Sequence, residues 1–203
     1  MRATSSRRRR IRALRAALAA AALLVVLAPS QAGAFGTVNG FFGQNGEHER
    51  ITRAALACPA GTPSDGSCFE PVSVTQIAGT PSGAFGAVGI PDFPPPAGPD
   101  SHCDDGDYLD PALYPRIASY PQTRAEADAA ILRCRTELAK RFREARDATP
   151  DLVGSNGRID PDEVDISPSC TFVGNISGDA KCDVFDGFGR SLHGVQDFYS
   201  HSN

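Results

Sequence analysis

The segment SLHGVQDFYSHSN, residues 191–203, decides the fold and the site that this sequence predicts. Read as an α-helix, it places His193, Asp197 and His201 on one stripe, because side chains four residues apart lie above one another on the same helical face. Imidazole and carboxylate groups are the usual nitrogen and oxygen ligands of zinc, and this spacing lets two of them reach one ion. The segment therefore predicts a helix that carries part of a metal site.

Two other segments predict helices. Residues 122–147 combine apolar residues near helical spacing with alternating charges, and EHERITRAALA predicts a helix from about Glu47 to Ala57. The last helix is expected to begin near Phe185. Residues 59–100 are rich in Pro, Gly, Ser and Thr and lack periodicity, which predicts long loops. No strand pattern is strong, so we expect a mainly α-helical domain with long loops pinned by disulfides.

The N-terminal 34 residues differ in composition from the rest. Residues 1–15 carry seven arginines and no acidic residue, an apolar run follows, and PSQAGA ends the segment. This order predicts a secretory signal peptide over residues 1–34, exported by either the general or the twin-arginine route, and a secreted domain over residues 35–203. A membrane anchor is the alternative, but an Ala-rich run of this length is marginal for spanning a bilayer.

Charge and cysteine content narrow the class of protein. Without residues 1–34, which hold seven of the 20 Lys and Arg and none of the 24 Asp and Glu, the net charge is about −11. This charge disfavours nucleic acids and anionic membranes as partners. Six cysteines in an exported chain predict three disulfides with fifteen possible pairings. Cys58 with Cys68 is the preferred pair, because the two bracket the turn-rich PAGTPSDGS.

The remaining metal ligands must come from outside the last helix, since one helix supplies two or three at most. His48 and His102, the other two of the four histidines, each lie beside acidic residues and are the candidates. None of the six cysteines has zinc-finger spacing, so we interpret them as structural.

These histidines and aspartates resemble the ligand pattern of the zinc-dependent phospholipases C and the related P1-type nucleases, a secreted helical family. In those phospholipases the mature N-terminal residue binds one zinc through its amine and carbonyl, and a histidine at mature position fourteen assists. Phe35 and His48 match that offset, with Phe in place of the usual Trp. Asp92 of GIPDF and His102 match a Pro-Asp dipeptide and a later histidine that bind another zinc.

The last helix matches the family at a His-x-x-x-Asp motif, whose carboxylate bridges two metals; HGVQD supplies His193 and Asp197. The resemblance implies a phospholipase C-like fold, two zinc ions, with a third in a longer chain, and a phosphodiester or phospholipid substrate. It implies Asp92 and Asp197 as catalytic residues. The implied metal ligands are Phe35, His48, Asp92, His102, His193, Asp197 and His201.

Two features depart from the phospholipases and leave other functions open. Three residues separate Asp197 from His201 instead of five, and with QDFYSHSN this resembles the Het-C-type branch. The family also continues into another His-x-x-x-acid pair, so we expect either a C-terminally incomplete chain or a two-metal version. The alternative function is a Het-C-like interaction or toxin-associated protein with structural zinc and no catalysis. A disulfide-stapled exported domain with unrelated histidines is a third interpretation.

Overall fold

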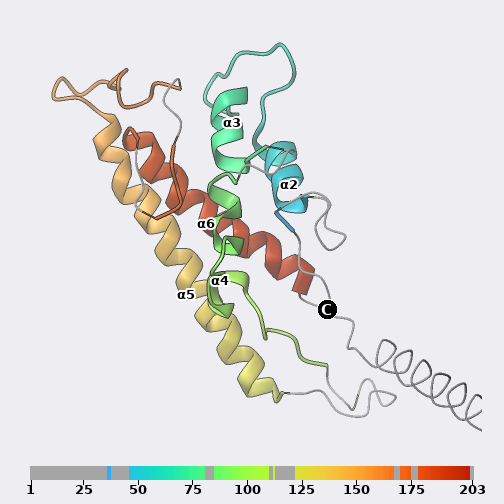
Figure 1. The fold of residues 1–203 in the computed structure, drawn as a ribbon. Helices are drawn as coiled ribbons and strands as arrows, with labels where there is room; N and C mark the ends of the chain where they lie inside the picture. Colours follow the sequence, from blue (N-terminus) through green and yellow to red (C-terminus); the bar gives the residue numbers. More distant parts are fainter. Residues whose placement is uncertain are drawn as a thin grey trace, which may run out of the picture. The chain divides into compact units, whose positions relative to one another are not determined.

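The computed structural model describes residues 36–37, 46–80, 85–109, 112, 122–166, 170–174 and 178–201. Of the final residue, His201, only the backbone is described. Within these ranges the chain forms helices, loops and isolated β-bridges but no strand, which confirms the prediction of a mainly α-helical fold (Figure 1). The predicted signal peptide and Phe35 lie outside the described ranges. None of the described helices combines the length and apolarity needed to cross a bilayer.

Two long helices, α5 (Arg124–Ala148) and α6 (Ala180–His201), pack along each other. Figure 1 shows α6 between α5 on one side and α2 (Glu47–Leu56) and α3 (Pro71–Ala78) on the other. The start of α5 is fixed by a capping box, in which the Thr123 hydroxyl accepts from the backbone of Glu126 and the Glu126 carboxylate accepts from the backbone of Thr123. Such a cap stabilises a helix by about 1 kcal/mol.

The last helix begins at Ala180, earlier than the predicted start near Phe185. The carboxylate of Glu163 accepts a hydrogen bond of 2.7 Å from the Ala180 N–H, so a residue 17 positions away satisfies one of the backbone donors at the N-terminus of the helix. A cap so distant in sequence leaves no local signal, which is why the prediction began the helix too late.

The prediction of long loops over residues 59–100 is wrong in part. This stretch contains α3, the 3-10 helix η1 (Ala87–Asp92) and the short helix α4 (Pro99–His102), and a second 3-10 helix, η2 (Thr149–Leu152), follows α5. Glu70 caps α3 with both carboxylate oxygens, and Pro71 suits the first helical position. These helices have ten residues or fewer, too few for helical periodicity to appear among the surrounding Pro and Gly.

The described core lies where η1, α3 and α6 meet. It is formed by five buried side chains with little or no exposure to solvent, namely Ile77, Ala87, Ile90, Phe172 and Phe185. Complete burial of an aliphatic side chain such as Ile77 contributes about 1.5–3 kcal/mol to folding. This packing fixes η1 against α6, which positions the residue at the end of η1, Asp92.

Glycines on α6 allow its neighbours to approach closely. A Cβ atom at Gly189 would lie 2.5 Å from Ala87 Cβ and 2.7 Å from Val88 N, and one at Gly187 would lie 2.6 Å from the backbone nitrogen of Ala145. Real Cβ atoms do not make such short contacts, so glycine is required at both positions for η1 and α5 to pack where they do.

All six cysteines form disulfides, in the pairs Cys58–Cys68, Cys103–Cys134 and Cys170–Cys182. The preferred pairing of Cys58 with Cys68 is confirmed, and so is the structural role of the other four. The second disulfide joins the residue that follows α4 to the middle of α5, two segments that the sequence separates by 31 residues.

Candidate metal centre

Five of the seven predicted metal ligands converge in one cluster. Helix α6 supplies two of them and three other elements supply one each; the members are His48 of α2, Asp92 at the end of η1, His102 at the end of α4, and His193 and Asp197 of α6. We call these five residues the His/Asp cluster. Because four separate elements contribute, the cluster exists only in the folded chain.

Three atoms of the cluster form a triangle with equal sides. His193 Nε2 and His102 Nδ1 lie 2.9 Å apart, and each lies 2.9 Å from Asp197 Oδ2. Ligand atoms on a tetrahedral zinc ion lie about 3.3 Å apart, since zinc–nitrogen bonds are about 2.0 Å long. A further carboxylate oxygen, Asp92 Oδ1, lies 3.7 Å from His193 Nε2, one corner of this triangle. Small shifts would therefore bring the ligand atoms of His102, His193 and Asp197 around one ion, with Asp92 beside His193.

The second carboxylate oxygen of Asp197 faces a different imidazole. Asp197 Oδ1 lies 3.2 Å from His48 Nε2, is buried, and receives no well-aligned hydrogen bond within the described ranges. A buried carboxylate oxygen without such a partner is costly unless a cation compensates it. Asp197 thus directs one oxygen at His102 and His193 and the other at His48, which is the arrangement of a carboxylate that bridges two metal positions.

The orientation of His193 fits metal binding. Its Nδ1 atom lies 2.8 Å from the carbonyl oxygen of Val88 and must donate its proton there, so the neutral ring presents a lone pair at Nε2. A metal-binding histidine usually donates its other ring N–H to a carbonyl or carboxylate in this way. Close packing of η1 on Gly189 brings Val88 to this position.

Two groups of three residues could each hold an ion, and they share one member. The first contains His48, Asp92 and His193, and the second contains His102, His193 and Asp197. With Nδ1 used by Val88, His193 has one nitrogen to give, so it can bind one metal at a time. The two groups of three therefore cannot both be filled through His193 at the same time.

Burial and charge set the proton affinities of the cluster without a metal. Burial alone would raise the pKa of Asp197, but the three neighbouring imidazoles hold this pKa well below its usual value. Burial alone would lower the pKa of His48 and of His102, but attraction to Asp197 raises both. The pKa of His193 is lowered, because burial and the charge on His48 outweigh its attraction to Asp197.

Solvent reaches the cluster from one side. The side chains of His48, His193 and Asp197 have no exposed surface, whereas those of His102 and Asp92 are 13% and 29% exposed. An ion in the cluster could therefore keep a position open to a water molecule or a small ligand between His102 and Asp92. Catalytic zinc sites need such a position, whereas structural sites are closed.

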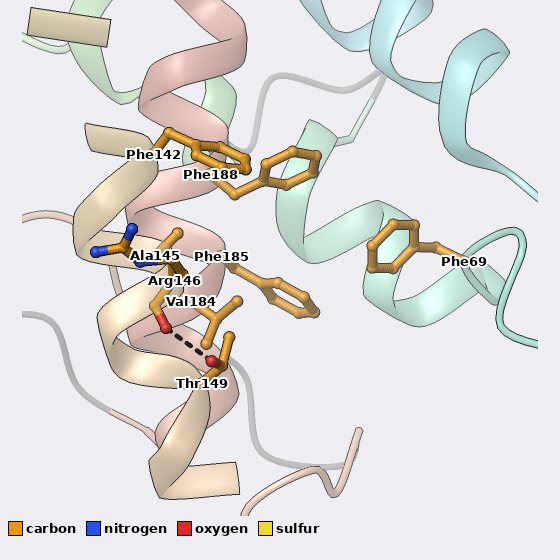
Figure 2. Close-up of a pocket in the computed structure, with 8 residues that line it drawn as sticks. All are labelled: Phe69, Phe142, Ala145, Arg146, Thr149, Val184, Phe185 and Phe188. Carbon is orange, nitrogen blue, oxygen red and sulfur yellow. Dashed lines mark hydrogen bonds between the residues drawn. The ribbon is translucent and has the colours of Figure 1, made fainter. Parts of the chain in front are cut away.

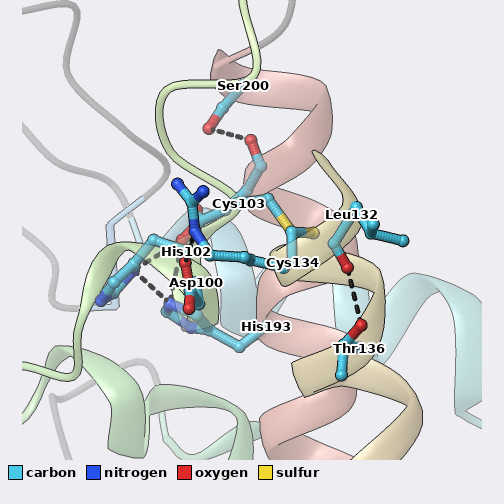
Figure 3. Close-up of a disulfide and its surroundings, with 10 residues drawn as sticks. Asp100, His102, Cys103, Leu132, Cys134, Thr136, His193 and Ser200 are labelled. Carbon is cyan, nitrogen blue, oxygen red and sulfur yellow. Dashed lines mark hydrogen bonds and ion pairs between the residues drawn. A yellow bond between two sulfur atoms is a disulfide. The ribbon is translucent and has the colours of Figure 1, made fainter. Parts of the chain in front are cut away.

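A disulfide anchors His102 beside the cluster. Figure 3 shows His102 pointing toward His193 while the next residue, Cys103, is bonded to Cys134 of α5. Arg133, adjacent to Cys134, forms an ion pair with Asp100 at 3.1 Å. The short helix α4 is thus held to α5 at both ends, which fixes the position of a ligand on a helix too short to be stable alone.

The structure does not describe the side chains of the two remaining predicted ligands, Phe35 and His201. Phe35 lies outside the described ranges, and the structure describes His201 by its backbone as the last residue of α6. The two residues after Phe35 do reach the cluster. Gly36 accepts a hydrogen bond of 3.3 Å from the backbone N–H of His48, and the Thr37 hydroxyl donates to Asp92 Oδ2.

Sequence reasoning missed two residues that contact the ligands, Thr37 and Gln196. Gln196 lies between two ligands of α6, but nothing in the local sequence indicates that its side chain reaches His48, 148 residues away. The contact between Thr37 and Asp92 likewise joins segments 55 residues apart.

A separate cavity of about 290 Å³ lies between α5, α6 and Phe69. Figure 2 shows Phe185 and Phe188 of α6 directed toward Phe69, and the ring centres of both lie about 6 Å from that of Phe69. Its lining contains no histidine, cysteine or carboxylate, so the cavity offers no metal ligand.

Comparisons with known protein families, with curated proteins and with solved structures found no match for this chain. The class of protein therefore rests on the site itself: buried histidine and aspartate groups that could hold a metal ion, in a helical chain with three disulfides.

Proposed function

We propose that the chain is a secreted zinc-dependent phosphoric-diester hydrolase, similar to the zinc-dependent phospholipases C. One observation carries the proposal: Asp197, buried on α6, directs Oδ2 at His102 and His193 and Oδ1 at His48. A carboxylate that bridges two metals fixes them at the short separation that displacement at phosphorus requires. The nitrogen-rich ligand set favours zinc over magnesium or calcium, which prefer oxygen ligands.

The residues divide between two metal positions. His102, His193 and Asp197 Oδ2 would hold the first ion, and Asp92, whose Oδ1 lies 3.7 Å from His193 Nε2, would be its fourth ligand. His48 and Asp197 Oδ1 would hold the second, together with the amine and carbonyl of Phe35 once the signal peptide is removed. The contacts of Gly36 and Thr37 with the cluster support this role for the preceding residue.

Bound zinc would supply a Lewis acid for phosphoryl oxygens and would lower the pKa of the water that it holds. The chain itself would contribute a carboxylate that orients the attacking water and a carboxylate that holds the metal ions in place. The Thr37 hydroxyl occupies Asp92 Oδ2, which leaves Oδ1 directed at the cluster on its exposed side. Asp92 is therefore suited to orient an attacking water by accepting its hydrogen bond. Asp197 is suited to hold the metal spacing constant and to offset part of the positive charge.

The charge of the secreted chain narrows the substrate. A net charge of about −11 repels a polyanion outside the metal site, so a nucleic acid is disfavoured. A phosphodiester with a single negative charge, free or in a phospholipid, meets less repulsion. This argument supports a phospholipase C-like substrate over a nuclease substrate.

The alternative is a Het-C-like interaction or toxin-associated protein in which zinc is structural. The complete burial of His48, His193 and Asp197 favours it, because structural zinc sites are enclosed. The exposure of Asp92 and His102 favours catalysis instead. Hydrolysis by the zinc-loaded protein discriminates the two.

The proposal is tested by metal analysis and hydrolysis on the same preparations. The secreted chain, purified without chelators, should contain about two zinc ions and hydrolyse a soluble choline phosphodiester or a phospholipid vesicle. Asp197→Asn should lose zinc and lower hydrolysis at least ten- to a hundredfold, as expected when a shared ligand is lost. Asp183→Asn, an exposed carboxylate on the same helix, is the matched control and should change neither. A zinc-loaded wild type that hydrolyses no phosphodiester would support the structural-zinc alternative.

A further inference from the structure

Gln196 links the cluster to helix α2 through both ends of its side-chain amide. Its Oε1 atom lies 2.8 Å from His48 Nδ1, and its Nε2 donates a hydrogen bond of 2.9 Å to Thr52 Oγ1. All three side chains are buried, with exposures of 7%, 0% and 1% for Gln196, His48 and Thr52. His48 and Thr52 lie one turn apart on α2, so a single amide spans one face of that helix.

These contacts determine which nitrogen of His48 carries the proton. An amide oxygen can only accept, so His48 Nδ1 must donate to Gln196 Oε1. A neutral ring then presents its lone pair at Nε2, which lies 3.2 Å from Asp197 Oδ1. If the amide were turned around, its NH₂ group would face Nδ1, the proton would move to Nε2, and that nitrogen could not bind a metal. Thr52 accepts from the NH₂ end and so holds the amide with its oxygen toward His48.

We propose that Gln196 is a positioning residue for the second metal position: it holds His48 in the tautomer whose Nε2 atom binds metal, with Thr52 fixing the amide. The inference rests on the two-metal centre proposed above. His193 is oriented by a backbone carbonyl, which side-chain substitution cannot remove, whereas His48 depends on a side chain. The affinity of the second position is therefore open to change at Gln196 while the first position is not.

The test measures zinc affinity and the His48 tautomer in the secreted chain. Wild type should bind zinc at two positions, as followed by competition with a chromophoric chelator. Gln196→Leu should keep the first ion and bind the second about 10- to 100-fold more weakly. Gln196→Glu keeps an acceptor at the same place and should restore the affinity. Thr52→Val should weaken the second position and Thr52→Ser should not.

The tautomer gives a readout that a purely structural role would not change. Long-range ¹H–¹⁵N spectra should show the Nδ1–H form of His48 in wild type and in Gln196→Glu, and a mixture of forms in Gln196→Leu. Gln122→Leu is the matched control, since it removes an amide that also makes two hydrogen bonds, to the carbonyls of Asp105 and Asp107. Gln122→Leu should leave the His48 spectrum and the zinc affinity of the second metal position unchanged.

The outcomes separate this inference from the proposed function. Suppose that wild type binds two zinc ions and that Gln196→Leu binds the second ion as tightly as wild type does. This result would overturn the role of Gln196 and would leave the proposed metal centre unaffected. An Nε2–H form of His48 in wild type would overturn it as well. A wild type that binds no zinc would overturn the metal centre, and the role of Gln196 with it. If Gln196→Leu fails to fold, the Thr52→Val and Thr52→Ser pair decides.

Discussion

The Nε2 atom of His193 lies 2.9 Å from the Nδ1 atom of His102, so two imidazole rings from segments 91 residues apart direct ring nitrogens at each other. Because His193 donates its Nδ1 proton to Val88, its Nε2 atom carries a lone pair when the ring is neutral. The same lone pair lies 2.9 Å from a carboxylate oxygen of Asp197. A proton or a cation between these atoms is needed to offset their repulsion. The cluster is therefore arranged so that either a proton or a metal ion could lie between these atoms.

The stability of the protein should depend on pH in opposite directions with and without zinc. The pKa values of His48 and His102 are raised, so their contribution in the metal-free protein is complete below about 6.5, the pKa in the unfolded chain, and is lost as the pH rises through the folded values. The lowered pKa of His193 removes stability as the pH falls below about 6.5. Metal-free protein should therefore be most stable near pH 6.5.

Zinc should reverse the alkaline part of this dependence, because protons no longer compete for the ring nitrogens at higher pH. Urea-unfolding midpoints at pH 6.5 and 8.5 check the prediction, with chelator in one series and excess zinc in the other. The midpoint should fall with pH in the first series and rise in the second. A metal-free midpoint that rises from pH 6.5 to 8.5 contradicts it.

The N-terminal amine gives an independent test of the second metal position. Chelation by Phe35 needs a free amine at that residue, so a chain carrying two extra residues before Phe35 should bind one zinc ion fewer than the chain that begins at Phe35. Mass spectrometry of the mature protein fixes its N-terminal residue, and elemental analysis gives the zinc content. Equal zinc content in both chains would exclude Phe35 as a ligand.

Gly189→Ala should disturb the metal centre through packing alone. The added Cβ would lie under 3 Å from backbone atoms of η1, and overpacking of this kind costs about 1–3 kcal/mol, partly offset by the better helix propensity of Ala. Since η1 carries both Val88 and Asp92, its displacement should also weaken zinc binding. Gly154→Ala is the control, because its Cβ meets ordinary contacts at 3.5 Å or more. Chemical denaturation and zinc titration of both variants measure the difference.

Thr123→Ala should lower stability without affecting zinc. Loss of the capping box costs about 1 kcal/mol, which corresponds to a fall of about 2–4 °C in Tm for a chain of this size. Thr136→Ala, an exposed position inside α5 whose hydroxyl bonds the carbonyl of Leu132, should leave Tm unchanged or raise it. Calorimetry measures both, and zinc content should equal that of wild type in each.

The sequence predicted the long helices and the cluster members for identifiable reasons. Spacing of four residues on a long helix placed His193 and Asp197 together, and residues 122–147 had enough length for a helical pattern to appear. The position of Asp92 came from resemblance to a family motif, because a 3-10 helix of six residues around a proline has no periodicity to recognise.

Contacts between distant segments could not be predicted. The start of α6 depends on Glu163, the orientation of His193 on the carbonyl of Val88, and that of His48 on Gln196. Each joins segments that meet only after folding, and a backbone carbonyl is present at every residue, so no residue type marks it. Local patterns and the family resemblance therefore indicated which side chains gather in the His/Asp cluster, but not which groups orient them.

The bond between Cys103 and Cys134 implies an order of maturation for the proposed exported protein. His102 immediately precedes Cys103, so the disulfide ties this cluster residue to α5. Thiols stay reduced in the cytosol and oxidise after export. Under the proposed export, the disulfide would therefore hold His102 beside the cluster only after the chain leaves the cytosol. If the proposed hydrolase activity is borne out, this order would keep the activity latent until the chain has left the cell that makes it.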